Sequence, residues 1–452
     1  MALLPSGCPW TRAPRQLTVT RRPAGTALGL VLLALTGCDK GPALSSTTKG
    51  DTEILETPDL GELDPKTRLG ALLDEVPIYA AASPKSPVVG FLHAGGTVPR
   101  SGRAHENELC VAGWYAIAPR GYVCSEKGAT TNLSHPTLSA MALGPRLDQP
   151  LPYVYARTSK VTAVYKRSLN KGVELSGRLA KSTVMAIVGS WTAPDESHEP
   201  QRLGLRMDGQ FVRADDLEPA LGSTFRGITL ESKQDLSLGF VVRRGVRLFS
   251  LEGDVPEKKG ELAYHDSMRL SGRFRTTDGE KFYERSDGAW VHHKDITLVQ
   301  ARGELPEFAT GNQKWIDISV ITGTLVAYEG NVPVFATLVS VGRDRLGDPE
   351  TTASTARGTF RVVEKHITRR ARPSEELALE DAPWAMKLES GQWLTASPRH
   401  DRFGIEHTDG DIEVSPADGA YLFAWATPNV PSGWHGVAVD PATETLVVNV
   451  RK

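Results

Sequence analysis

The sequence predicts a mainly β protein built from several small sheets, and three observations support this prediction. The 452-residue chain contains 43 glycines and 30 prolines, which is typical of frequent turns. β-Branched and aromatic residues occur in short runs between these turns, as they do in strands. Two segments 79 residues apart repeat one pattern, which indicates a duplicated module. The length allows about two to four domains.

An export leader is predicted at residues 1–38. Arginines precede an apolar stretch at 27–36, which has the length of a signal-peptide core and is too short to cross a membrane as a helix. The stretch ends in the sequence LTGC at 35–38, which resembles a bacterial lipobox. The resemblance implies cleavage before Cys38 and attachment of lipid to its thiol. The alternative is an ordinary secretory signal with an incidental cysteine. A flexible polar tether is expected at 39–70.

These features predict an exported protein that is lipid-anchored to the bacterial cell envelope, at the periplasmic face or at the outer membrane. Removing the four arginines of the leader changes the formal net charge from −2 to about −6. A nucleic-acid partner is therefore not expected, because such proteins need a clustered basic face. No apolar run reaches the roughly 18 residues of a membrane-spanning helix.

Two of the four cysteines remain for the mature fold. Cys8 lies in the leader and Cys38 is the expected lipidation site, which leaves Cys110 and Cys124, 14 residues apart. An oxidising compartment favours a disulfide between them, worth about 3 kcal/mol by loop entropy. A metal pair is the alternative, but no His or Cys partner at zinc-like spacing lies nearby. No metal and no cofactor are expected.

The first predicted domain covers residues 71–130. Its strands are expected at 76–79 and 88–92, followed by a Trp-Tyr strand around Trp114 and a Gly-Tyr-Val strand at 121–123. This order resembles a bacterial SH3-like domain, which implies a small barrel. The two cysteines would then join the two strands around Trp114.

A duplicated β module is predicted at 150–222 and again at 235–305. Asp208-Gly209 in the first copy corresponds to Asp287-Gly288 in the second, and Asp-Gly is a hairpin turn signal. In both copies another Asp follows eight residues after the first. The copies could be diverged SH3-like units that bind cell-wall ligands, or spacers that hold the last domain at a distance.

A third β-rich domain with one short helix is predicted at 310–452. Ile316, Ile318 and Val320 alternate with polar residues, as in a strand with one buried face. A helix is expected to begin after Ser415 as N-cap, because proline follows it and an acid stands at the third helical position. Pro428 would end this helix.

This last domain resembles the L,D-transpeptidase catalytic domain, a β-rich fold whose members cross-link peptidoglycan stem peptides. The resemblance covers about 125 residues, 314–437, and departs from the family at Ala356, where proline is usual. The segments that carry it are Trp315-Ile316-Asp317, Thr355-Ala356-Arg357-Gly358-Thr359-Phe360, Asp381-Ala382-Pro383-Trp384, His400-Asp401-Arg402-Phe403-Gly404 and Ser415-Pro416-Ala417-Asp418.

The resemblance also implies where catalysis would occur. Family members use a Cys thiolate as nucleophile and a His that takes its proton, in a Ser-His-Gly-Cys signature just before the helix. The sequence TDGDIEV at 408–414 stands at these positions. The nucleophile position therefore holds Asp411, and the family His positions hold Asp409 and Thr395. Because no cysteine follows Cys124, no thiol can replace the lost nucleophile.

The domain is therefore interpreted as a pseudoenzyme. The alternative is an active L,D-transpeptidase with a rearranged site, which would need Ser397 or Ser415 beside His400 or His407.

The expected function is binding of peptidoglycan or of a cell-wall enzyme, and a third possibility is an adaptor that contacts only proteins. The groove that would bind is expected to be lined by Trp384, His400, Arg402, His407 and Gly410. Acids and imidazoles crowd into 400–413, but they lack the ligand spacing of a calcium loop and are interpreted as a polar surface loop. His292 and His293, beside Lys294, are interpreted as a solvated strand end.

Overall fold

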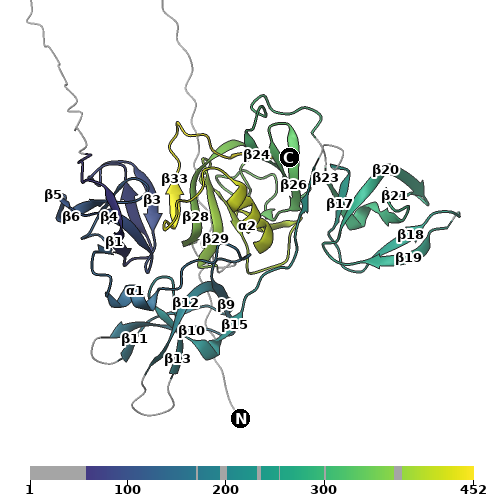
Figure 1. The fold of residues 1–452 in the computed structure, drawn as a ribbon. Helices are drawn as coiled ribbons and strands as arrows, with labels where there is room; N and C mark the ends of the chain where they lie inside the picture. Colours follow the sequence, from purple (N-terminus) through teal and green to yellow (C-terminus); the bar gives the residue numbers. More distant parts are fainter. Residues whose placement is uncertain are drawn as a thin grey trace, which may run out of the picture. The chain divides into compact units, whose positions relative to one another are not determined.

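Strands dominate the computed structural model of the protein, which confirms the mainly β prediction (Figure 1). The structure describes residues 57–168, 172–193, 201–231, 236–253, 255–299, 302–370 and 379–452. The predicted leader, with Cys38, and residues 39–56 of the predicted tether lie outside the described residues. No helix in the described ranges is long and apolar enough to cross a membrane.

The N-terminal strands form a small, tightly packed unit. One sheet joins β4, β1 and β8, and β1 begins at Leu63, within the range expected to be tether. Leu69, Ile78 and Val123 are among the fully buried side chains of its core. The elements are β1 (Leu63–Ala71), β2 (Val76–Tyr79), β3 (Val88–Leu92), β4 (Thr97–Ser101), β5 (His105–Asn107), β6 (Cys110–Ala116), β7 (Tyr122–Cys124), β8 (Ala129–Thr130) and the short helix α1 (Pro136–Ala140).

The predicted disulfide joins Cys110 and Cys124, with their Cα atoms 5.9 Å apart. It links β6 to β7, and the register pairs Trp114 with Cys124. Trp114 is completely buried, and its Nε1 donates a hydrogen bond of 3.0 Å to Oδ1 of Asn107. The disulfide therefore joins β6 to β7, as the sequence predicted, whereas the indole of Trp114 links β6 to β5.

The two predicted modules have the same strand order. The first sheet runs β11-β10-β14-β13-β12-β9-β15 and the second β19-β18-β22-β21-β20-β17-β23. The first contains β9 (Val154–Thr158), β10 (Thr162–Ser168), β11 (Gly172–Leu179), β12 (Val184–Ala193), β13 (Gln201–Arg206), β14 (Phe211–Arg213), the 3₁₀ turn η1 (Ala214–Asp216) and β15 (Leu217–Pro219). The second contains β17 (Leu238–Val241), β18 (Val246–Ser250), β19 (Glu257–Leu262), β20 (Ser267–Thr277), β21 (Glu280–Arg285), β22 (Trp290–His292), the 3₁₀ turn η3 (His293–Asp295) and β23 (Ile296–Val299). This identity of topology supports the duplication.

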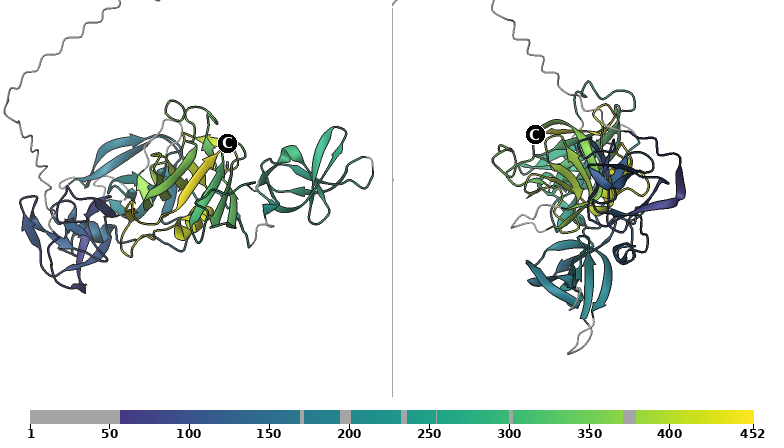
Figure 2. Two further views of the ribbon diagram at one scale, coloured as in Figure 1. Left: turned by 90° about the horizontal axis from the view of Figure 1, so that it is seen from above. Right: turned by 90° about the vertical axis from the view of Figure 1, so that its left-hand side faces the viewer.

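The C-terminal domain adds a larger sheet. Strand β34 lies parallel to β24 and antiparallel to β28, so the last strand of the chain sits between strands from the start and middle of the domain (Figure 2). Its elements are β16 (Ile228–Thr229), β24 (Lys314–Ser319), β25 (Thr324–Glu329), β26 (Val332–Leu338), β27 (Val341–Gly342), β28 (Gly358–Arg370), β29 (Asp381–Leu388), β30 (Trp393–Ala396), β31 (Glu406–Thr408), β32 (Ile412–Val414), α2 (Pro416–Trp425), β33 (Gly436–Ala438) and β34 (Val447–Arg451).

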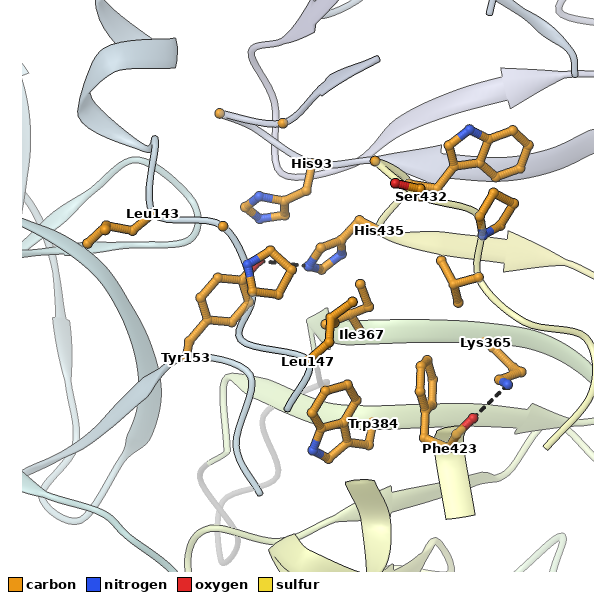
Figure 3. Close-up of a pocket in the computed structure, with 18 of the residues that line it drawn as sticks. His93, Leu143, Leu147, Tyr153, Lys365, Ile367, Trp384, Phe423, Ser432 and His435 are labelled. Atoms are coloured by element: carbon orange, nitrogen blue, oxygen red, sulfur yellow. Dashed lines mark hydrogen bonds between the residues drawn. The ribbon is translucent and has the colours of Figure 1, made fainter. Parts of the chain in front are cut away.

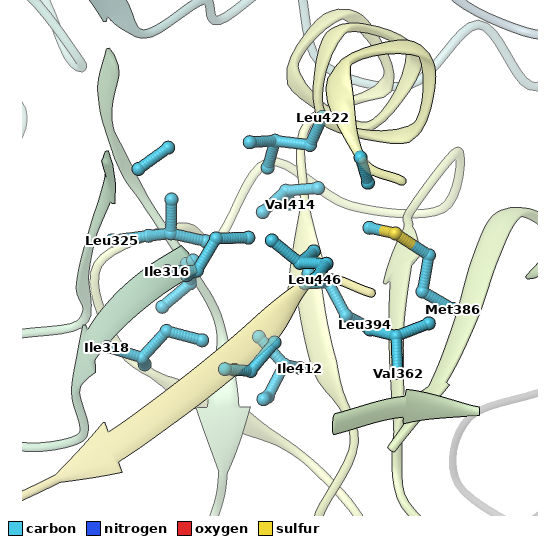
Figure 4. Close-up of a cluster of buried hydrophobic side chains, with 14 of the residues drawn as sticks. Ile316, Ile318, Leu325, Val362, Met386, Leu394, Ile412, Val414, Leu422 and Leu446 are labelled. Atoms are coloured by element: carbon cyan, nitrogen blue, oxygen red, sulfur yellow. The ribbon is translucent and has the colours of Figure 1, made fainter. Parts of the chain in front are cut away.

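Alternating apolar side chains form the core of this domain. Ile316 and Ile318, which predicted the first strand, are fully buried, and Leu422 of α2 meets Val414 and Leu446 in the same cluster (Figure 4). One face of the sheet is buried beneath α2, but the expectation of a single buried face is wrong. Asp317 and Ser319 are each 2% exposed and Trp315 is fully buried, because a second hydrophobic cluster covers the other face.

Helix α2 begins and ends through specific polar contacts. Ser415 is the N-cap, and its hydroxyl accepts a hydrogen bond of 3.2 Å from the backbone N–H of Asp418. At the other end, Nζ of Lys365 donates to the carbonyl oxygens of Phe423 (2.8 Å) and Ala426 (2.6 Å). Carbonyls at the end of a helix lack intrahelical donors, so a buried amine satisfies them.

Strand β3 of the N-terminal unit pairs with β33 of the C-terminal domain, in the register Gly90 to Val437. Trp434 and Val437 consequently complete the N-terminal core. Residues 57–130 therefore share both a sheet and a core with the C-terminal domain, which the sequence did not indicate.

Candidate functional site

Asp411, which the sequence analysis assigned to the nucleophile position of the family, lies immediately before β32. Oδ1 of Asp411 accepts a hydrogen bond of 2.9 Å from the backbone N–H of Trp393 in the neighbouring strand β30. Burial raises the pKa of the Asp411 carboxyl, and the Trp393 hydrogen bond opposes this shift only in part. The Asp411 carboxyl therefore links β30 to the segment that leads into β32.

Thr395 and Asp409, which the sequence analysis assigned to the histidine positions of the family, lie apart in different surroundings. Thr395 is buried on β30, where its register partner on the parallel strand β32 is Glu413. Asp409 lies at the surface, where Nη1 of Arg343 donates to its Oδ1. Within the described part of the chain, neither side chain hydrogen-bonds the Asp411 carboxyl.

The backbone conformation at position 410 favours glycine. Its φ is +115°, a region that favours glycine, and a Cβ would lie 2.9 Å from Nε2 of Gln392. Its carbonyl oxygen accepts a hydrogen bond of 2.9 Å from Oγ1 of Thr355. Gly410 thus has a backbone role in this structure.

A buried ionic cluster centred on Glu413 is the main feature that the sequence did not predict. Glu413 is 5% exposed; its Oε1 accepts from Nη2 of Arg399 at 2.7 Å, and its Oε2 lies 2.6 Å from Nε2 of His400. Burial alone would raise the pKa of Glu413, but Arg399 and His400 hold it at about 2. In the sequence, only the density of charged residues at 400–413 pointed to this cluster. The folded structure determines that Arg399 and His400 are the partners of Glu413.

His400 is held in one tautomer by its two neighbours. Its Nδ1 accepts a hydrogen bond of 3.0 Å from the backbone N–H of Arg402, so the ring proton is on Nε2 and is donated to Glu413. The ring of His407 stands edge-on to His400, with centroids 4.5 Å apart. Burial, followed by the nearby His400 and Arg399, lowers the pKa of His407 to about 4, so it is neutral at pH 7.

Neither serine considered as a replacement nucleophile has a base. Ser415 is the N-cap of α2, and Ser397 is fully buried with no hydrogen-bond partner at its Oγ. Because Nε2 of His400 is engaged by Glu413, it does not activate either hydroxyl.

The five residues expected to line one groove are divided between three places. His400, Arg402 and His407 lie together around Glu413, and Gly410 lies beside Thr355 and Gln392. Trp384 instead lines a separate cavity, where its ring packs on Phe423 with centroids 5.2 Å apart.

This cavity has a volume of about 620 Å³ (Figure 3). Its walls come from the β3–β4 connection, residues 141–153, strands β28 and β29, helix α2 and the segment 429–435. Trp384, Phe423 and Ile367 form apolar walls, and His93 and His435 add polar edges. The sequence did not indicate this cavity, because its lining residues are scattered over more than 300 positions.

Two groups of potential metal ligands occur among the described residues. In the first, the sulfur atoms of Cys110 and Cys124 are bonded to each other, so they are not available as thiolates. In the second, Glu280 lies near His292 and His293, and its Oε1 also accepts from Nζ of Lys294 at 2.8 Å. The predicted solvated strand end is thus an ion-paired one.

Comparisons with known proteins agree with the resemblance. Residues 313–442 match the family model of the L,D-transpeptidase catalytic domain (YkuD). Similar solved structures include an L,D-transpeptidase from Xylanimonas cellulosilytica, with 19% identity, 34% of this chain and 71% of that chain covered, and a TM-score of 0.23. Another is the L,D-transpeptidase from Mycobacterium smegmatis, with 14% identity, 50% and 88% covered, and a TM-score of 0.25. A third is L,D-transpeptidase 1 of Mycobacterium tuberculosis, with 18% identity, 47% and 88% covered, and a TM-score of 0.22.

No curated protein matches the chain. The match of residues 313–442, which contain Asp411, Glu413 and α2, confirms the sequence-based assignment of this part of the chain. Residues 313–442 therefore form an L,D-transpeptidase-like domain.

Proposed function

We propose that this protein is a lipid-anchored component of the bacterial cell envelope whose L,D-transpeptidase-like domain binds peptidoglycan or a cell-wall enzyme without catalysing acyl transfer. The observation that carries the proposal is the hydrogen bond made by Asp411, the residue assigned to the nucleophile position. There the Asp411 carboxylate accepts the backbone N–H of Trp393 at 2.9 Å and braces two strands.

Chemistry supports inactivity. Acyl transfer through Asp411 would form an anhydride from an amide, which is far harder than forming the thioester of a cysteine enzyme. The histidine relay of the family would also be missing, because Thr395 and Asp409 occupy the histidine positions and His400 donates its ring proton to Glu413. The buried ion pairs of Glu413 would instead hold the loop at 400–408 in one conformation.

The surface beside this cluster supports a binding role. The side chain of Arg402 is exposed, and its backbone is fixed by the hydrogen bond to His400. Peptidoglycan stem peptides carry carboxylates, which an exposed guanidinium recognises well. We therefore assign ligand contact to Arg402, on the loop that the Arg399–Glu413–His400 cluster supports.

The first experiment measures co-sedimentation of the full chain, without its leader, with purified sacculi. A truncation before residue 310 is unsuitable because β33 completes the N-terminal sheet. We expect Arg402→Glu to reduce the pelleted fraction at least threefold. The control Arg243→Glu makes the same charge change at an exposed position of the second module and should pellet like wild type. Wild-type protein that stays in solution would refute peptidoglycan binding and favour a protein partner.

Inactivity is tested separately by intact mass spectrometry after incubation with imipenem. We expect no mass increase, because the chain presents no thiolate in residues 313–442. An active cysteine L,D-transpeptidase treated in parallel serves as the positive control. A stoichiometric adduct on this chain would establish a rearranged catalytic site instead.

Lipidation is tested by fractionating cells that express wild-type protein or Cys38→Ser. The wild-type protein should stay with the membranes in high salt, whereas the variant should be released or retain its leader. Equal membrane association would show an anchor other than Cys38.

A further inference from the structure

We propose that the 620 Å³ cavity binds a small, mostly apolar, uncharged molecule that donates one hydrogen bond to Nε2 of His93. A cavity of this size lies within the usual range of about 300–1,000 Å³ for small-molecule sites. Its position is separate from the Asp411 and Glu413 region, so the inference does not depend on the proposed function.

The acceptor is the most specific feature of the cavity. His93 is 8% exposed, and its Nδ1 lies 3.0 Å from the carbonyl oxygen of Ala94. Because a carbonyl only accepts, Nδ1 carries the ring proton and Nε2 is left with a lone pair. That Nε2 is buried and has no hydrogen-bond partner. Buried polar atoms without a partner are rare, so a ligand donor would satisfy it.

The side chains next to His93 do not donate a hydrogen bond to its Nε2. The ring of His435 lies beside it, with centroids 4.6 Å apart, and Nε2 of His435 already pairs with the Tyr153 hydroxyl at 3.2 Å (Figure 3). Burial lowers the pKa of His93, so the ring stays neutral and keeps its acceptor at pH 7. A hydroxyl or an N–H of a ligand is the donor that fits.

The charges around the cavity favour an uncharged ligand. Among the described residues that line it, none is acidic, and Lys365 is the single Lys or Arg. Its Nζ donates to the carbonyls of Phe423 and Ala426, and burial lowers its pKa to about 7. The amine is therefore committed to the end of α2 and offers little attraction to an anion.

The walls favour an apolar body. Leu143 and Leu147, which line the cavity from the segment after α1, are 68% and 63% exposed. Trp384, Phe423 and Val188 supply buried apolar surface on other sides. A ligand that fills the cavity would cover the two leucines and remove their side chains from water.

The test uses two probes that differ in one donor, 2-naphthol and 2-methoxynaphthalene, titrated calorimetrically into the full chain without its leader. Both have the same apolar rings, but only the naphthol donates a hydrogen bond. We expect the naphthol to bind roughly tenfold more tightly, since one hydrogen bond contributes about that factor. Equal affinities, or no binding of either probe, would overturn the proposal.

Variants locate the interaction. His93→Phe keeps an aromatic ring but removes the acceptor, and should abolish the preference for naphthol. Ala424→Trp, at an exposed position of α2 on the cavity wall, should weaken both probes at least tenfold. Leu175→Trp, on exposed strand β11 of the first module, is the control and should bind as wild type. A wild-type response from Ala424→Trp would place the probes elsewhere and refute this site.

Discussion

The two modules share one topology, yet they bury the same turn to different extents. In the first, Gly209 N–H donates to the carbonyl of Arg206 at 3.1 Å, and in the second Gly288 N–H donates to Arg285 at 3.0 Å. The Arg–Asp pair beside each turn is also repeated, at 3.1 Å for Arg206–Asp208 and 2.9 Å for Arg285–Asp287. Local sequence therefore determines the turn in both copies.

The surroundings of the two pairs differ. In the first copy, the side chains of Arg206 and Asp208 are 5% and 8% exposed, whereas Arg285 and Asp287 in the second are 23% and 55% exposed. Arg206 also contacts Glu380 at 3.3 Å, in the C-terminal domain. The repeat sequence alone therefore does not determine how much the ion pair contributes to stability. That contribution depends on whether the module packs against the C-terminal domain.

Other contacts strengthen the docking of the first copy. Oδ2 of Asp381 accepts a hydrogen bond of 2.9 Å from the backbone N–H of Ala186, and Val184 forms a β-bridge with Leu379. Leu379 and Ala382 of the C-terminal domain also belong to the hydrophobic core of the first module.

The largest expected effect comes from removing the buried arginine. Arg206→Ala should lower the free energy of unfolding by about 3–5 kcal/mol, because it leaves Asp208 and Glu380 buried with less compensation. Arg285→Ala, at the equivalent position, should cost about 0–1 kcal/mol, as for a surface pair. Chemical denaturation of both variants measures the difference. Equal losses would mean that burial does not distinguish the two copies.

The next effect is a pH dependence specific to the docked copy. Burial raises the pKa of Asp381 to about 7, so the folded protein favours its protonated form. Its contribution to stability is fully present below the unfolded pKa of about 4 and is lost as pH rises through about 7, on the order of 2–4 kcal/mol. Unfolding of wild type and Asp381→Asn at pH 4 to 8 should show wild type losing stability relative to the variant. A constant difference would contradict this cause.

The smallest effect should be equal in both copies. Gly209 and Gly288 have φ of +76° and +82°, and a Cβ at either position would meet nothing within 4 Å. Gly209→Ala and Gly288→Ala should therefore each cost about 1–2 kcal/mol through backbone strain alone. Melting curves that differ between the two variants would show that docking also alters the turn.

The sequence identified features whose causes lie close together in the chain. The Asp-Gly turns, the Ser415 N-cap of α2 and the pairing of Cys110 with Cys124 were all predicted and are present. Each depends on φ preference, capping or a short loop, which a few neighbouring residues specify. The resemblance of residues 313–442 to an L,D-transpeptidase domain was likewise readable, because it depends on ordered motifs.

The pairing of residues far apart in the chain could not be predicted from the sequence. The acids and imidazoles at 400–413 are visible in the sequence. Their roles depend on tertiary contacts: Glu413 becomes a buried ionic centre through the parallel pairing of β30 with β32 and the contact with Arg399, and Asp411 hydrogen-bonds the backbone of β30.

By itself, the sequence determined the Asp-Gly turns, the capped start of α2, the pairing of Cys110 with Cys124 and the absence of a cysteine beyond Cys124. The tertiary structure alone decided that β3 joins β33, that one repeat is docked more deeply than the other, and that His93 reaches a cavity shared with Trp384. The physical reason is the range of the forces involved. Backbone preferences act over a few residues, whereas burial and the pairing of charges depend on which distant segments exclude water together.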